Sequence, residues 1–99
     1  MQIDIRSIHF KADRKLEAFI KEKIEKLSQF YDGVIAGEVA LKLDNNDSQD
    51  NKVTEIKLNV RGNDLYAKKQ SKTFEESTDN AVEALRRQLI KYKEKMRNS

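Results

Sequence analysis

Basic residues are concentrated near the end of the chain, and amine and guanidinium groups can bind phosphate. Residues 84–99 contain six bases and one acid, whereas residues 74–83 contain four acids and no base. Acids early and bases late in a helix complement its dipole, but that effect is about 0.3 to 1 kcal/mol per charge and is confined to the terminal turns. The bases extend over about three turns, so they indicate either a solvated helix end or a phosphate-binding surface.

These bases divide into two flanks of a predicted helix when each residue is placed at 100° steps. One flank holds Arg87, Lys91 and Lys95, and the other holds Arg86, Lys93 and Arg97. A flank beside an apolar stripe lies next to the element that the stripe packs against. One of the two flanks is therefore predicted to line a groove between two helices.

A second basic group comes from an earlier predicted helix. Lys23 falls between Leu16 and Leu27 inside the apolar stripe, and Lys26 lies one step further round. A buried, unpaired ammonium is costly, so Lys23 must either extend to water or meet an anion. Both outcomes are open for Lys23 alone, but two basic groups on one layer of the fold favour anion binding. The predicted binding surface, which we call the basic strip, comprises Lys23, Lys26, Arg86, Arg87, Lys91, Lys93 and Lys95.

Other reactive residue types form no convincing site. Zero Cys excludes thiol catalysis and cysteine-ligated zinc, and the single histidine, His9, leaves no histidine pair for a metal. The aspartates of 44–51 lack the glycine and the closing glutamate of a calcium loop, and the glycines fit no phosphate-loop motif. We therefore predict no catalytic residue, no metal and no cofactor, and an enzyme is the function class that the sequence supports least.

Apolar periodicity predicts the elements that must position the strip. The predicted strands lie at about 2–9, 38–43, 55–61 and 65–71, and the predicted helices at about 14–30 and 74–96. Asp13 is a predicted N-cap, Thr73 and Glu76 have capping-box spacing, and Gly33 is predicted to end the first helix in a left-handed conformation. Residues 44–51 are predicted to form a long, mobile, acidic hairpin loop.

The order of these elements is β-α-β-β-β-α. Each predicted strand has one polar face and each predicted helix one apolar stripe, which favours two helices packed on one face of a four-stranded mixed sheet. The first two strands need a crossover connection, and the last three can form a meander. We predict an α+β two-layer sandwich comprising one domain, residues 1–99.

Composition restricts the setting of this domain. Of the 99 residues, 37% are hydrophobic and 37% are charged, with a net charge of +3. The N-terminus lacks an apolar signal core, and no stretch approaches the roughly 18 apolar residues of a membrane span. We expect a cytoplasmic protein that does not bind a membrane. A small-molecule substrate is not expected either, because a domain of this size is too thin for a deep cavity.

Four segments together carry a resemblance to a known family: Met1 to Ile5, Glu22 to Asp32, Leu65 to Ala67, and Asp79 to Lys91. In this order and at these separations, they make the chain similar to the ribosome hibernation-promoting factor family, also called protein Y or ribosome-associated inhibitor A, in its short form. The resemblance covers nearly the whole chain. It implies a two-layer domain like those that bind double-stranded RNA.

The resemblance also implies a function and a partner. Members of the family occupy the channel of the small ribosomal subunit where messenger and transfer RNA would lie, contact 16S rRNA through basic residues of both helices, and inhibit translation in stationary phase or stress. By position, the residues that match family RNA contacts are Lys23, Lys26, Arg87 and Lys91. The other members of the basic strip are inferred from the charge pattern. We expect the chain to be monomeric off the ribosome.

This chain departs from the family pattern in one relevant segment. Many relatives have Lys-Leu-Glu-Arg-Gln-Leu where this chain has Ala84 to Leu89, so a lysine is lost and Arg86 replaces a glutamate. Since the sequence stops at Ser99, ribosome pairing through a second C-terminal domain is not expected. Two other functions remain open: a general double-stranded-RNA-binding module, and a protein-interaction adaptor that uses the polar face of the sheet.

Overall fold

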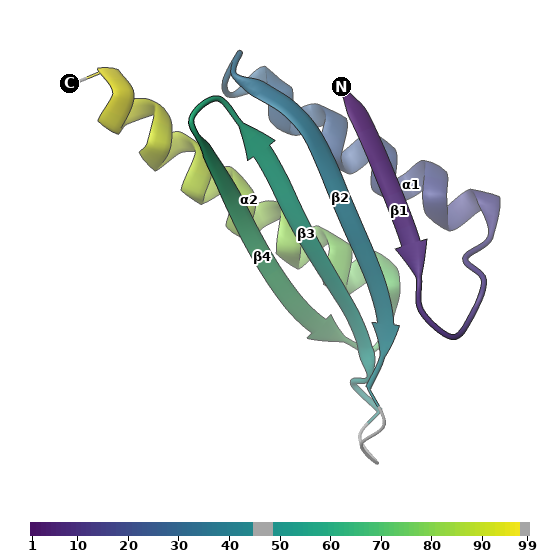
Figure 1. Cartoon of the computed structure of the whole chain (residues 1–99). Coiled ribbons are helices and arrows are strands. Elements are labelled where there is room, and N and C mark those ends of the chain that lie inside the picture. The colour runs from purple at the N-terminus through teal and green to yellow at the C-terminus, as the bar shows by residue number, and fades with distance from the viewer. Residues whose placement is uncertain (45–48, 98–99) are drawn as a thin grey trace.

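The computed structural model describes residues 1–44 and 49–97, and these form four strands, two α-helices and one short 3₁₀ turn (Figure 1). The elements in chain order are β1 (Gln2–Ser7), α1 (Arg14–Glu25), the 3₁₀ turn η1 (Lys26–Gln29), β2 (Val34–Leu43), β3 (Lys52–Val60), β4 (Asn63–Ser71) and α2 (Phe74–Arg97). The predicted element order is confirmed. No helix among the described residues is long and apolar enough to cross a membrane.

The sheet has the order β1-β2-β3-β4, with β1 parallel to β2 and the other neighbours antiparallel. The parallel pair requires a crossover, and α1 provides it. Both helices lie on one face of the sheet, as Figure 1 shows, and the opposite face is open. The predicted α+β two-layer sandwich is therefore confirmed.

The core fills the space between the sheet and the helices. Its largest fully buried apolar side chains are Ile20, Ile24, Leu27, Leu41, Ile56, Leu58, Leu85 and Leu89. Tyr31 and Tyr92 pack against this core, and their rings contact each other edge to face with centroids 5.8 Å apart. The Tyr92 hydroxyl donates to the carbonyl oxygen of Arg61 at 2.6 Å, which ties α2 to the turn between β3 and β4.

Both predicted helix starts are confirmed by their caps. The Asp13 carboxylate accepts from the Leu16 N–H at 2.8 Å, and the Thr73 hydroxyl accepts from the Glu76 N–H at 3.0 Å. Each cap satisfies a donor that lacks a partner inside the helix. These caps set where α1 and α2 begin, and hence which turn of each helix carries a given base.

The structure corrects the ends of several predicted elements. Strands β2 and β3 begin earlier than predicted, at Val34 and at Lys52. The strand predicted at 2–9 ends at Ser7, and His9 adopts a left-handed φ of 67°, which a regular strand cannot accommodate. The helix predicted at 14–30 is α-helical only to Glu25 and then tightens into η1, where the Phe30 N–H donates to the Leu27 carbonyl at 3.1 Å.

Gly33 does not have the left-handed conformation that the sequence predicted. The glycine with positive φ among the described residues is Gly62, at 79°, in the turn that starts β4 at Asn63 rather than at 65. A Cβ at Gly33 would clash with the ring of Tyr31, so a larger residue there would require that ring to shift. Of the acidic loop predicted at 44–51, residues 45–48 lie outside the described residues.

Candidate nucleic-acid interface

A hollow between the two helices gathers three members of the basic strip. Lys23 of α1, Lys26 at the start of η1 and Arg86 of α2 all line it, above a floor that includes Leu27 and Phe30. We call this hollow the inter-helix groove. The prediction that one flank of α2 lines a groove between the helices is confirmed for Arg86.

Lys23 reaches both water and an anion, the two outcomes left open by its position. Its side chain is 34% exposed, and its Nζ lies 3.4 Å from the Asp79 carboxylate of α2. The same ammonium lies 5.3 Å from the centre of the Phe19 ring, within range of a cation–π contact. Lys23 is therefore anchored between the helices while its charge stays accessible.

Arg86 and Arg87 share one carboxylate. Glu83 accepts hydrogen bonds from Arg86 Nε, at 2.9 Å, and from Arg86 Nη2, and it lies 3.5 Å from Arg87 Nε. The hydrogen bond from Arg86 lowers the pKa of Glu83, and the same bond raises the pKa of Arg86. The carboxylate is ionised and the guanidinium charged at any physiological pH.

Arg87 lies outside the inter-helix groove, in an adjoining hollow that it lines with Lys69, Asn80 and Ala84. Glu83 lines both hollows, so it stands between the two flanks of α2. The structure thus joins the flanks at Glu83 instead of placing every base in one groove.

The remaining bases of α2 continue the strip toward the C-terminus. Lys93 lines a hollow with Gln29, Phe30 and Arg97, next to the inter-helix groove. The helical spacing places Lys91 and Lys95 on the Arg87 flank. All three lysines are exposed, and none has a carboxylate within 4.0 Å in the part of the chain that the structure describes.

The ion pair of Lys26 is exposed and weak. Its Nζ lies 3.8 Å from Glu22, and both side chains are more than half exposed. An exposed pair of this kind contributes about 0 to 1 kcal/mol, so a phosphate can replace the carboxylate at little cost. Lys26 is therefore available to a polyanion, whereas Glu83 holds Arg86 by a bidentate contact and Asp79 holds Lys23.

The sequence-based reasoning missed the two carboxylates inside the strip, Asp79 and Glu83, which it assigned to the dipole of α2. A signal for one of them was present, because an acid three or four residues before a base lies next to it on a helix. Glu83 precedes Arg86 by three and Arg87 by four. No such local signal exists for Asp79, whose partner Lys23 comes from the other helix.

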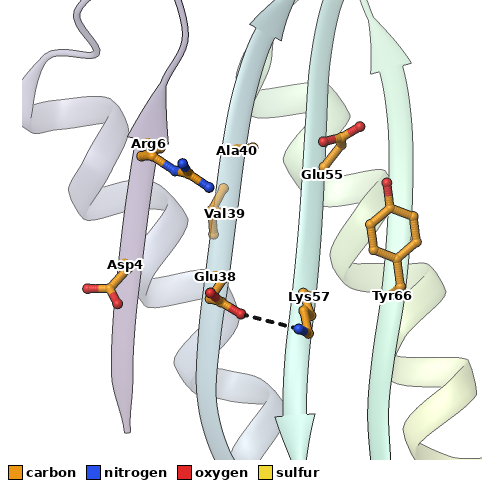
Figure 2. A pocket seen from close by; sticks show the side chains of 8 residues that line it. All are labelled: Asp4, Arg6, Glu38, Val39, Ala40, Glu55, Lys57 and Tyr66. Carbon is orange, nitrogen blue, oxygen red and sulfur yellow. Dashed lines mark ion pairs between the residues drawn. The ribbon is translucent and has the colours of Figure 1, made fainter.

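The open face of the sheet carries a shallow hollow of mixed charge, shown in Figure 2. It is lined by Asp4, Arg6, Glu38, Val39, Ala40, Glu55, Lys57 and Tyr66. Acids and bases alternate across the strands, as in the pair of Lys57 and Glu38 at 3.8 Å (Figure 2). A surface of this kind attracts a polyanion less than the helix face does.

Glu55 is the centre of a network on this open face. Its side chain is 17% exposed and pairs with Lys42 of β2 at 2.9 Å and with Lys68 of β4 at 3.6 Å. Burial would raise the pKa of Glu55, but the hydrogen bond from Lys42, the charges of Lys42 and Lys68 and the Tyr66 hydroxyl outweigh it, so the pKa lies below its usual 4.5. The network links three strands.

This lowered pKa makes the stability contributed by Glu55 dependent on pH. The ionised form stabilises the fold fully above about 4.5 and stops doing so as the pH falls through the lower pKa of the folded state. We expect Glu55→Gln to be less stable than the parent at pH 7, and the difference to narrow below pH 4.5. Urea unfolding of both proteins at neutral and acid pH measures this difference in the free energy of unfolding.

The matched control for this prediction is Glu25→Gln. Glu25 is exposed and has no base within 4.0 Å among the described residues, so its free energy of unfolding should change by less than about 0.5 kcal/mol. A stability difference for Glu55→Gln that is equal at both pH values would contradict the pairing.

The described residues contain no group of three His, Cys, Asp or Glu side chains that could hold a metal ion. What the helix face offers instead is an array of accessible cations on two helices, with aromatic rings beneath them. Such an array can neutralise several phosphates at once.

Comparison with known proteins gives concordant results for sequence and fold. The family model described as "Sigma 54 modulation protein / S30EA ribosomal protein" matches residues 3–97. The chain is 28% identical over 100 residues to proteins named ribosome hibernation promoting factor from Klebsiella oxytoca and from Escherichia coli (strain K12), and each alignment covers 98% of both chains.

Two solved structures are similar in fold. The Protein Y N-terminal domain of Thermus thermophilus has a TM-score of 0.81 at 18% identity, with 93% of this chain and 99% of that one covered. A ribosomal subunit interface protein from Coxiella burnetii has a TM-score of 0.82 at 17% identity, with 94% of this chain and 98% of that one covered. At these identities the likeness establishes the fold alone.

Proposed function

Since this chain belongs to the sigma 54 modulation protein / S30EA ribosomal protein family, we propose that it is a cytoplasmic ribosome hibernation factor. In this proposal residues 1–99 form one ribosome-binding domain that binds 16S rRNA in the messenger and transfer RNA channel of the small subunit. Translation in stationary phase or stress is then inhibited without catalysis. The names of the full-length relatives support the proposal.

The observation that carries the proposal is the convergence of bases from both helices on one face. Lys23, Lys26 and Arg86 share the inter-helix groove, and Arg87 adjoins it across Glu83. Folded ribosomal RNA presents phosphates from several strands at once. A surface with cations on two helices can contact phosphates from more than one strand.

Inhibition follows from occupancy. The domain measures 47 × 24 × 17 Å, so when its helix face is held on the subunit its bulk excludes other ligands from the same channel. In this scheme Lys23, Lys26, Arg87 and Lys91 bind phosphates as the family pattern implies. Arg86, Lys93 and Lys95 add charge next to them, and Arg86 compensates for the lysine replaced by Ala84.

Sedimentation through a sucrose gradient tests the proposal. In a stationary-phase lysate we expect the chain to comigrate with small subunits or intact ribosomes. With purified subunits, neutralising about five phosphates predicts that a fourfold rise in salt weakens binding roughly a hundredfold or more. Absence from the ribosomal fractions, or binding that does not respond to salt, would contradict the proposal.

Two further arms of the same experiment separate the other functions. A general double-stranded-RNA-binding module would bind a free RNA duplex as tightly as it binds small subunits. An adaptor that uses the open face of the sheet would keep its partner after nuclease treatment. The ribosome-binding proposal expects a clear preference for subunits and loss of the complex after nuclease treatment.

A further inference from the structure

Two carboxylates lie among the cations of the helix face, where a phosphate would have to approach. Asp79 holds Lys23 at 3.4 Å, and Glu83 holds Arg86 at 2.9 Å and Arg87 at 3.5 Å. A surface built only to attract RNA would gain from having no acid at these positions. Their presence requires an explanation beyond phosphate binding.

We propose that Asp79 and Glu83 restrain the affinity of the helix face for RNA in general and so determine its selectivity. This inference rests on the proposed function and deepens it. Each carboxylate occupies the place that a phosphate oxygen would take beside its base. An RNA gains from Lys23, Arg86 and Arg87 only if its phosphates avoid the carboxylates or displace them.

The contact geometry of Glu83 shows how an RNA of suitable shape can bind Arg86 without being repelled by the carboxylate. An arginine carries five N–H donors in one plane, and Glu83 accepts from Arg86 at Nε and Nη2 only. The remaining donors, on the far edge of the guanidinium, have no hydrogen-bond partner among the residues that the structure describes, and the bidentate contact holds the group in a fixed plane. A phosphate that reaches this edge binds a preorganised group, whereas one that approaches from the side of Glu83 is repelled.

The location of Glu83 extends this effect to both flanks of α2. It lines the inter-helix groove and the adjoining hollow of Arg87, so one carboxylate screens both arginines. Asp79 acts in the same way on Lys23 across the helix contact. A regular RNA duplex has two phosphate paths of fixed spacing, so it has less freedom than folded RNA to place its phosphates away from the acids.

The test compares two isosteric variants on two RNAs. Glu83→Gln keeps an oxygen that can accept from Arg86 but removes the charge. Glu25→Gln is the matched control, because it causes the same change in net charge and Glu25 lines neither of the two hollows that Glu83 lines. Glu25 lines a hollow with Met1, Lys26 and Ser28, but its carboxylate pairs with no base among the described residues. The dissociation constants are measured for a perfect RNA duplex of unrelated sequence and for purified small subunits over a range of salt.

We expect Glu83→Gln to bind the unrelated duplex about threefold to tenfold more tightly than the parent, since a charge within several ångströms is removed. The dependence of duplex binding on salt should steepen by about one phosphate equivalent. Affinity for small subunits should rise less, so the preference for subunits falls. Glu25→Gln should change duplex binding by less than about twofold, and Asp79→Asn should behave like Glu83→Gln.

Equal effects of Glu83→Gln and Glu25→Gln would overturn the inference, because net charge alone would then explain them. Weaker duplex binding by Glu83→Gln would also overturn it, since the carboxylate would then only position Arg86. Thermal unfolding of each variant verifies the fold. If the parent shows no preference for subunits, the proposed function fails, while the duplex measurements still decide the role of Glu83.

Discussion

Simultaneous charge reversal of Lys23 and Arg87 is expected to abolish binding to the small subunit while leaving the fold intact. Each substitution to Glu removes an attraction for phosphate and adds a repulsion, at about 2 kcal/mol per site for contacts near a protein surface. Together they predict a loss of affinity of at least about a thousandfold. Cosedimentation of the Lys23→Glu, Arg87→Glu variant with purified subunits measures the effect.

The fold should survive because neither side chain is buried: Lys23 is 34% exposed and Arg87 is 72% exposed. The reversal loses the ion pairs with Asp79 and Glu83 and places a new carboxylate beside each acid, which should cost about 1 kcal/mol per site. Circular dichroism should show unchanged helix content. A variant that is folded and still binds subunits would remove Lys23 and Arg87 from the interface.

The matched control reverses two bases away from the helix groove. Lys21 lies on the opposite side of α1 from Lys23, because two residues span about 200° of a helix. Arg6 lies on the open face of the sheet (Figure 2). The double variant Lys21→Glu, Arg6→Glu has the same net charge as the test variant, and we expect it to keep most of its subunit binding. If it also loses binding, net charge and not the helix face governs the interaction.

Truncation of Leu85 to Ala is expected to cause the largest loss of stability. Leu85 is fully buried in the centre of α2, in the same core cluster as Ile56 and Leu58 of β3. Removing a buried leucine side chain costs about 2 to 5 kcal/mol, a large part of the roughly 5 to 15 kcal/mol that holds a domain folded. The midpoint of thermal unfolding should fall by about 10 to 30 °C.

Leu43→Ala is the control for this truncation. Leu43 ends β2 and is 42% exposed, so the same chemical change should cost about 0.5 kcal/mol or less. Equal destabilisation by the two substitutions would mean that α2 does not pack on the sheet as described. Because Arg86 and Arg87 follow Leu85 directly, the packing of the Leu85 side chain in the core also fixes the position of the basic strip.

The fold was predictable because its signals are local. The apolar repeat of α2 and the alternation of β3 each indicate which side of an element is buried, and the Asp13 and Thr73 caps mark where helices begin. The fold class follows once every element has one apolar side. The ends of elements were less predictable. The tightening at Lys26 and the left-handed conformation of His9 occur where the chain changes direction toward its next element, and that direction depends on tertiary packing.

The sequence by itself determined which bases share a flank of a helix, because helical geometry converts spacing into direction without reference to the rest of the molecule. Only the tertiary structure decided what each flank faces: Arg86 the groove with Lys23, and Arg87 the neighbouring hollow with Lys69. It also decided that Asp79 of α2 neutralises Lys23 of α1, since that contact depends on the distance between two helices and on no spacing along the chain.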